Sequence, residues 1–296
     1  MKIAIHHRKG SFSDRWIEYC IENNVQYIIV NAFDSNIIEQ VRDYDIFLWH
    51  HHHGDYKDVL VAKKILYALE QAGKIVFPNF NTGWHFDDKV AQKYLLGFIN
   101  APLVPSYIFY EKDKAVEWAK NTSYPKVFKL KGGAGSMNVS LVKNQRDCLK
   151  LINKAFKKGF SQYNTKNAIK DDLLKLKETK QAIYFVKAIS RFIRKPKFAK
   201  AQTREKGYVY FQDFIPNNDS DLRIICVGEK AFALKRMIRE DDFRASGSGN
   251  IIYDHTQICS EAIKISFETM TKMKASCRAF HYVFDGFGKA LIVEIS

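Results

Sequence analysis

The sequence predicts an α/β region followed by an α+β region, and three observations support this. Over about the first eighty residues, short apolar runs alternate with segments of helical periodicity. Beyond Pro102 and Pro105, strand-like runs follow one another, and a long basic helical segment separates two groups of them. The hydrophobic content of 46%, with 22 Phe and 15 Tyr, excludes a disordered chain, and 296 residues suffice for two or three domains.

The first region is expected to form a parallel sheet with crossover helices, because its strands and helices alternate. We expect strands at residues 2–7, 25–32, 44–51 and 74–79, with helices at 13–24, 36–43 and 57–73. This is a small Rossmann-like unit. No glycine fingerprint follows its first strand, so dinucleotide binding is not expected there.

The second region is expected to begin with a helix at residues 87–100. Strands are predicted at 106–110, 126–131, 138–142, 208–216, 221–228 and 230–238, and a final helix and a hairpin lead to residue 296. We therefore divide the chain into residues 1–85, 86–210 and 211–296. No internal repeat interrupts this order.

The remaining composition excludes several classes of protein. The five cysteines show no C-x-x-C spacing, so neither a disulfide framework nor a zinc ribbon is expected. The N-terminus does not have the pattern of a signal peptide, and no apolar stretch reaches the length of a membrane span. We expect a soluble protein of the cytoplasm.

Positive charge is concentrated in one segment. Residues 150–206 contain 17 Lys and Arg against four acids, whereas the whole chain has a net charge of +15. Leu, Ile and Phe recur there at helical spacing, so helices with a basic face are expected. The segment is either a solvated helical insertion or a surface for an anionic partner such as a lipid headgroup, nucleic acid or acidic glycan.

A glycine-rich turn lies between two short apolar runs, in the stretch VFKLKGGAGSMNVSLV of residues 127–142. It matches neither G-x-x-x-x-G-K-[ST] nor G-x-G-x-x-G. It is either an ordinary hairpin loop or a turn whose amides bind phosphate, since glycines let the backbone approach an anion closely. Lys129, on the strand before the turn, would supply a point charge to that phosphate.

The second half of the chain also carries short motifs in a fixed order. They are Asp88-Lys89, Pro125 to Lys129, Gln212 to Ile215, Asp221 to Arg223, Arg236, Phe243-Arg244 and Val293 to Ser296. In order and spacing they resemble the ATP-grasp carboxylate-amine ligases, which include D-alanine-D-alanine ligase, glutathione synthetase and the ligases that add glutamate to a ribosomal protein. The resemblance implies an ATP-grasp fold with an N-terminal Rossmann-like (pre-ATP-grasp) domain, and it spans nearly the whole chain.

The resemblance implies roles in nucleotide binding for particular residues. The phosphates would lie against Lys89, Lys129, Gly132, Gly133, Gly135 and Ser136. The adenine would lie at the hinge Gln212, Asp213, Phe214 and Ile215, hydrogen-bonded by the main chain of Asp213 and Ile215. Asp221 would accept hydrogen bonds from the ribose, or else pair with Arg223.

Two arginines are implied in catalysis. Arg236 would steady the transferring phosphoryl group or the acyl-phosphate, together with Lys129, or else it is an ordinary surface arginine between Lys235 and Met237. Arg244 lies in a stretch that resembles the F-R-x-N of the ribosomal-protein ligases, with Ser246 where that family has asparagine.

The magnesium site implied by the resemblance departs from the family pattern. Glu294 matches the family's glutamate, Ser296 replaces an asparagine, and His281 stands thirteen residues before Glu294, where the family has an aspartate. Asp285 is expected to start the hairpin turn instead. Because histidine is a poor magnesium ligand, either Glu294 binds the metal with phosphates and water or catalysis is impaired. The motif normally continues beyond Ser296, so we expect a C-terminal tail.

Six of the nine histidines follow two strands of the first region. His6 and His7 end the first strand, and the run His50 to His53 ends the third. Since the carboxyl ends of parallel strands face the ligand crevice, these histidines are expected on one rim with Arg8 and residues 11–15, where they shape a substrate pocket. A metal cluster is not expected, because adjacent histidines cannot all face one ion.

The resemblance implies an ATP-dependent ligase that forms an amide through an acyl-phosphate, with ATP and Mg²⁺ as cofactors. The chain most resembles ATP-grasp proteins of bacterial surface-polysaccharide biosynthesis, so an amino acid joined to a sugar acid is expected, with the basic segment at the inner membrane surface. A homodimer is expected from the relatives, and a nucleic acid partner is not. The alternatives are a ligase that modifies peptides or proteins, and a catalytically impaired nucleotide-binding module.

Overall fold

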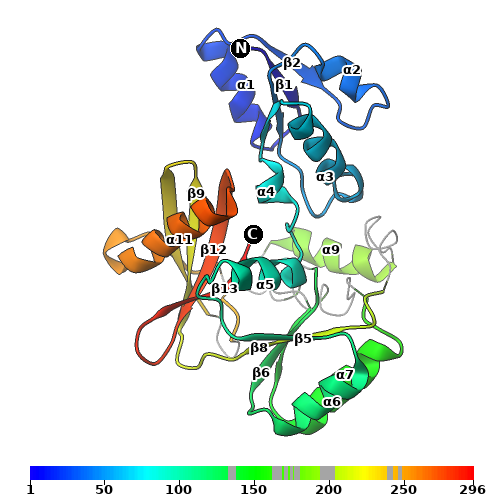
Figure 1. Ribbon diagram of the computed structural model, residues 1–296, viewed down its shortest axis with the longest axis vertical. Coiled ribbons are helices and arrows are strands. Elements are labelled where there is room, and N and C mark those ends of the chain that lie inside the picture. Colours follow the sequence, from blue (N-terminus) through cyan, green and yellow to red (C-terminus); the bar gives the residue numbers. More distant parts are fainter. Residues whose placement is uncertain are drawn as a thin grey trace.

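The computed structural model describes residues 1–132, 138–161, 181–193, 204–238, 243–245 and 249–296, together with residues 169, 173 and 176. Within this part of the chain, the strands form three sheets. The N-terminal unit lies at one end of the molecule and the sheet that contains β5, β6 and β8 at the other, with the C-terminal sheet beside α5 between them (Figure 1).

The N-terminal sheet is parallel, with the strand order β2-β1-β3-β4. Its strands are β1 (Ile3–His6), β2 (Tyr27–Val30), β3 (Ile46–Trp49) and β4 (Ile75–Phe77), and its helices are α1 (Ser13–Glu22), α2 (Ile37–Val41) and α3 (Tyr56–Gln71). Phe47, Trp49 and Leu66 are buried at its core. The alternation in the sequence therefore predicted this unit correctly.

The middle sheet has the order β5-β8-β6-β7, with antiparallel neighbours. It consists of β5 (Ser106–Phe109), β6 (Lys126–Lys129), β7 (Val139–Val142) and β8 (Val209–Asp213), with α6 (Lys112–Asn121) and α7 (Gln145–Phe156). Ala119, Phe128 and Ile152 pack between the helices and the sheet. The glycine-rich turn joins β6 to β7 as expected, and its residues 133–137 lie outside the described residues. The helix α9 (Ala182–Ile193) follows in the basic segment.

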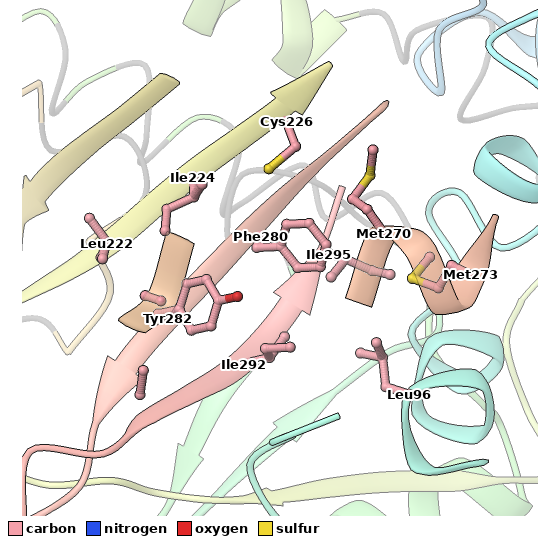
Figure 2. Packing of buried hydrophobic residues seen from close by; sticks show 12 residues of the cluster. Leu96, Leu222, Ile224, Cys226, Met270, Met273, Phe280, Tyr282, Ile292 and Ile295 are labelled. Atoms are coloured by element: carbon pink, nitrogen blue, oxygen red, sulfur yellow. The ribbon is translucent and has the colours of Figure 1, made fainter. Parts of the chain in front are cut away.

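The C-terminal sheet has the order β11-β10-β9-β12-β13. Its strands are β9 (Ser220–Val227), β10 (Lys230–Met237), β11 (Ile251–Ile252), β12 (Cys277–Phe284) and β13 (Ala290–Ile295), with the short η1 (His255–Gln257) and the helix α11 (Ser260–Met273). Figure 2 shows Phe280, Tyr282 and Ile292 on the side of the sheet that faces Met270 of α11 and Leu96. Asp285 starts the β12–β13 turn as predicted, since its carboxylate accepts from the amides of Phe287 and Lys289.

Leu96 belongs to α5 (Lys89–Phe98), which therefore packs on the C-terminal sheet although the sequence division placed it in the second range. The expected boundary between residues 210 and 211 falls inside β8. The division into the three ranges stays a prediction, while the three sheets themselves occupy residues 3–77, 106–213 and 220–295.

A polar junction joins the N-terminal unit to the C-terminal sheet. The side chain of Asn79 caps α4 (Phe80–Gly83) by accepting from the Thr82 amide at 3.0 Å. The same side chain donates to the Lys274 carbonyl at 2.7 Å and accepts from the Ser276 amide at 3.1 Å. Arg278, buried on β12, donates to the Thr82 carbonyl. One asparagine thus satisfies backbone groups of two units at once.

We expect Asn79→Ala to lower the free energy of unfolding by about 2 kcal/mol, because it removes a helix cap and leaves partly buried groups unpaired. Asn121→Ala is the matched control, since Asn121 is exposed and its side chain donates only to the Glu117 carbonyl among described residues. Urea unfolding of both variants measures the difference. Equal losses would show that the junction contributes no stability.

Candidate nucleotide site

A cavity lies between the middle sheet and the C-terminal sheet. Strands of both sheets line it, together with the loops that follow β8 and β10. Ten of the sequence-predicted residues are among its lining: Lys129, Gln212, Asp213, Phe214, Ile215, Asp221, Arg236, Arg244, His281 and Glu294. Residues far apart in the sequence thus meet at one place, and this is the candidate site.

The two sheets are joined at one backbone carbonyl. Val293, on β13, accepts a hydrogen bond from Lys129 Nζ at 3.4 Å and from Gln212 Nε2 at 3.1 Å. Lys129 and Gln212 belong to β6 and β8 and are both buried. The pairing therefore holds the middle sheet against the last strand of the chain.

Glu294, next to Val293, lies among cations. Its carboxylate is 3.7 Å from Nζ of Lys89, which stands in the first turn of α5, where Asp88 caps the helix by accepting from the Ala91 amide. Burial alone would raise the pKa of Glu294, but the positive charges of Lys89 and Lys129 outweigh it and lower this pKa to about 2. Glu294 is therefore ionised at every physiological pH.

Burial has the dominant effect on Lys129. It lowers the pKa of the ammonium to about 8; the charge of Glu294 opposes the change, and that of Lys89 adds to it. At neutral pH the side chain still carries its proton. A charged donor is thus held in a dry position between the sheets.

Asp221 and Arg236 form a bidentate ion pair across β9 and β10. They stand directly opposite each other in the antiparallel register, with Nε to Oδ1 at 2.7 Å and Nη2 to Oδ2 at 2.5 Å. Burial would raise the pKa of Asp221, but the hydrogen bonds and the charge of the Arg236 guanidinium lower it overall. Asp221 pairs with Arg236, so the alternative prediction that it pairs with Arg223 was wrong. Arg236 is buried, so the alternative that it is an ordinary surface arginine was also wrong.

His281 continues this network toward the end of the chain. Its Nδ1 lies 2.7 Å from Arg236 Nη2 and its Nε2 lies 3.1 Å from Ser296 Oγ. A guanidinium only donates, so Nδ1 accepts and Nε2 carries the proton. Burial lowers the pKa of the imidazole, which keeps it neutral. His281 stands opposite Glu294 in the strand register.

This geometry decides which side chains fit a magnesium ion. Within the described ranges, no group of three or more His, Cys, Asp or Glu side chains is arranged for a metal. Both ring nitrogens of His281 are engaged, so its contacts do not favour the expected role as a ligand, which stays a prediction. Glu294, about one-third exposed, fits as a single carboxylate ligand, with Ser296 Oγ nearby. Mg²⁺ bound to a nucleotide commonly takes one or two carboxylates, with phosphates and water completing its shell.

The predicted adenine hinge follows β8 and is held by polar contacts. Asp213 accepts from Lys126 Nζ at 2.6 Å, and its amide donates to the Pro105 carbonyl at 2.9 Å. That amide is therefore already used, and a main-chain contact of Asp213 with a base would have to use another group. Phe214 packs edge-on against Phe243, beside Arg244, so the two loops close one end of the cavity.

The start of the glycine-rich turn is anchored by a carboxylate that the sequence did not point to. Glu205 accepts from the amides of Lys131 at 3.1 Å and Gly132 at 3.3 Å, and Tyr208 donates to the same carboxylate. The Gly132 amide thus binds a protein anion here, and its role toward phosphate stays a prediction. Gly133, Gly135 and Ser136 lie outside the described residues.

Arg223 is a further site residue that sequence reasoning treated only as a partner for Asp221. It stands opposite His281 in the β9–β12 register, and its Nε is buried without a hydrogen-bond partner among the described residues. Burial, and then the charge of Arg236, lower its pKa. Period-two alternation along β9 could have revealed it, since residues 221 and 223 share one face of a strand.

The histidines follow adjacent strands, as predicted, because β1 pairs with β3. His6 accepts from the Ala32 amide at 2.9 Å, and its ring packs against Trp49. His50 is 3.0 Å from Ser11 Oγ, and its main-chain carbonyl is 3.5 Å from Nη2 of Arg8. These contacts hold His6 and His50 at the carboxyl ends of their strands. The role of this rim as a substrate pocket stays a prediction.

The low pKa of Lys129 predicts how stability depends on pH. The unfolded side chain titrates near 10.5 and the folded one near 8, so between these values the unfolded chain binds more protons and the free energy of unfolding rises with pH. Relative to Lys129→Met, the wild type should gain about 3 kcal/mol across this window. Urea unfolding of both proteins at several pH values measures it. A constant difference would contradict the burial of a charged Lys129.

The chain is similar to known proteins in its structure rather than in its sequence. No protein-family model and no curated protein matches the sequence. Among solved structures, the chain is similar to a RimK domain ATP-grasp protein from Sphaerobacter thermophilus, with 14% identity, a TM-score of 0.57, and coverage of 100% of this chain and 90% of that one.

Two further structures contain nucleotides. The D-alanine--D-alanine ligase from Bacillus anthracis, complexed with ATP, shares 13% identity at a TM-score of 0.60, with 100% of this chain and 85% of that one covered. The biotin carboxylase domain of the Hydrogenobacter thermophilus 2-oxoglutarate carboxylase, in complex with MgADP, ADP and bicarbonate, shares 13% identity at a TM-score of 0.61, with 100% and 63% covered. The chain therefore has the ATP-grasp fold along its whole length.

Proposed function

We propose that the protein is an ATP-dependent ligase that joins a carboxylate to an amine through an acyl-phosphate. The observation that carries this proposal is a cluster of cations around one carboxylate at the cavity, Glu294. Lys89, Lys129 and Arg236 all act on this carboxylate, and Arg236 also pairs with Asp221. Buried cations need anions beside them, and a triphosphate between the two sheets supplies these charges.

Each side chain has a distinct part in this reaction. Lys89 and Lys129 neutralise phosphate oxygens as point charges, and Glu294 would hold Mg²⁺, which would supply further positive charge to the triphosphate. The Asp221 carboxylate fixes the plane of the Arg236 guanidinium, so that its remaining donors are already oriented toward the transferring phosphoryl group. Positioning and charge neutralisation are most of what a protein supplies to phosphoryl transfer.

The reaction has two chemical steps. A carboxylate oxygen attacks the γ-phosphorus, and the bond from that phosphorus to the ADP oxygen breaks. The amine then attacks the acyl carbon, inorganic phosphate leaves, and the nitrogen loses a proton as the amide forms. The protein does not need a nucleophile of its own, because the mixed anhydride is already activated.

The substrate class is proposed from the resemblance in sequence. It favours a sugar acid of a surface glycan as the carboxylate and an amino acid as the amine, at the cytoplasmic face of the membrane and in a homodimer. A peptide or protein carboxylate is the second candidate. A nucleotide-binding module without turnover is favoured by one observation, the engagement of both His281 nitrogens, and opposed by the intact cluster of cations.

Nucleotide binding tests the site first. Titration calorimetry with ATP and Mg²⁺ should detect binding in the wild type, and Lys129→Met should weaken it by about tenfold or more, or about 1.4 kcal/mol, because a buried charge on the phosphates is lost. Glu294→Gln should remove the magnesium dependence. Lys114→Ala, an exposed lysine on α6, is the control. Binding that ignores both Mg²⁺ and Glu294 would favour the module without turnover, and no binding would refute the site.

Turnover tests the reaction without knowledge of the amine. Hydroxylamine traps an acyl-phosphate as a hydroxamate, so candidate sugar acids and peptides are compared by hydroxamate formation and phosphate release. Arg236→Met should lower kcat by about 100-fold with little change in nucleotide affinity, since a donor to the transferring group is removed. Lys235→Met, the neighbour on β10, is the control. If no carboxylate in the panel gives hydroxamate while ATP binds, the ligase proposal fails.

A further inference from the structure

The helix α9 is exposed to an unusual degree. It spans Ala182–Ile193, and among its described side chains only that of Tyr184 is half-buried, while the others are exposed. Ile183, Phe185, Val186 and Ile189 expose between 46% and 63% of their surface. In Figure 1 the helix lies at one edge of the molecule, away from the core of the C-terminal sheet. A helix this apolar normally buries such side chains.

Three of the four exposed large apolar side chains share one face of the helix, whereas Ile183 lies beside Lys187, four residues further on. At 3.6 residues per turn, Phe185, Val186 and Ile189 lie on one face, and Lys187 lies on the opposite side. A helix of this length is marginal in water unless its apolar face is covered. An apolar face that the fold leaves uncovered marks a surface for a partner.

The charge around the helix indicates the chemistry of the partner. α9 lies inside residues 150–206, which carry 17 Lys and Arg against four acids. Basic residues both precede and follow the helix in the sequence, with Lys175, Lys177 and Lys180 on one side and Arg194, Lys195 and Lys197 on the other. An exposed apolar face within a strongly basic segment is the pattern of a helix that lies in a bilayer interface.

We propose that α9 docks this protein on an anionic lipid bilayer. Phe185, Val186 and Ile189 enter the boundary between headgroups and acyl chains, and the basic residues that precede and follow the helix in the sequence bind the anionic headgroups. A nucleic acid would be held by charge and by stacking on aromatic rings, and two of the three side chains on this face, Val186 and Ile189, offer no ring to stack on. No described helix is long and apolar enough to cross a membrane, so this contact is peripheral.

The proposal does not rest on the ligase activity, since it concerns residues outside the candidate site. Docking would bring the cavity to the surface where lipid-linked anionic substrates are found. The two proposals therefore fail separately, one by loss of vesicle binding and the other by loss of nucleotide binding or turnover.

Cosedimentation of the full chain with vesicles tests the docking. The wild type should bind vesicles of phosphatidylcholine mixed with phosphatidylglycerol, and bind pure phosphatidylcholine much less. Val186→Asp with Ile189→Asp should lower the partition coefficient by about tenfold or more, because two apolar side chains no longer enter the interface. Lys187→Glu should lower it by less, about fivefold, and added salt should weaken binding.

The control is Phe287→Asp, which replaces the most exposed large apolar side chain outside this helix, in the β12–β13 turn. It should leave the partition coefficient unchanged. Circular dichroism and ATP titration establish that each variant is folded. Absence of vesicle binding by the folded wild type overturns the proposal, as do equal losses in the Phe287 variant. Binding to RNA that the Asp substitutions leave intact, or a change of oligomeric state without lipid binding, would assign the surface to another partner.

Discussion

The buried ammonium of Lys129 is the constraint on which the site depends. It lies between two sheets that touch at the Val293 carbonyl, and a charge in that position is costly unless hydrogen bonds and an opposite charge accompany it. Glu294 supplies the opposite charge, and Lys89 adds a second cation to the same carboxylate. The two sheets therefore cannot separate or shift in register without leaving a charge unpaired. Lys129 and Glu294, which stabilise the interface, also line the cavity.

The strand register of the C-terminal sheet determines which residues meet in the network of Asp221, Arg236 and His281. Asp221 faces Arg236 across β9 and β10, while His281 faces Arg223 on one side and Glu294 on the other. Because antiparallel partners stand about 5 Å apart, these residues meet without any long loop. The neutral His281 then serves as a hydrogen-bonding link between Arg236 and Ser296. In this chain, guanidinium groups occupy the surroundings of Glu294, so the protein itself carries much of the positive charge beside the cavity.

The nucleotide site and α9 use positive charge in different ways. In the cavity, cations are buried and held in fixed positions by partners, which suits a ligand with several defined oxygens. Around α9, basic residues precede and follow the exposed apolar side chains in the sequence, which suits a surface that has no fixed arrangement of its groups. Residues 150–206 account for most of the net charge of +15, and the total alone does not show where in the chain the charge lies.

The sequence by itself determined the local elements and the order of the site residues. Periodicity predicted the parallel unit at residues 3–77 and the antiparallel pair around the glycine-rich turn, since both depend on neighbouring residues. Motif spacing predicted that Lys129, Asp221, Arg236 and Glu294 share a site. Only the tertiary structure decided that α5 packs on the C-terminal sheet, that Asp221 pairs with Arg236, and that Glu205 anchors Lys131 and Gly132. These contacts join residues that are 15 to more than 190 positions apart in the sequence, or they depend on the register between strands. A local pattern of residues does not specify which distant residue will lie opposite a given one.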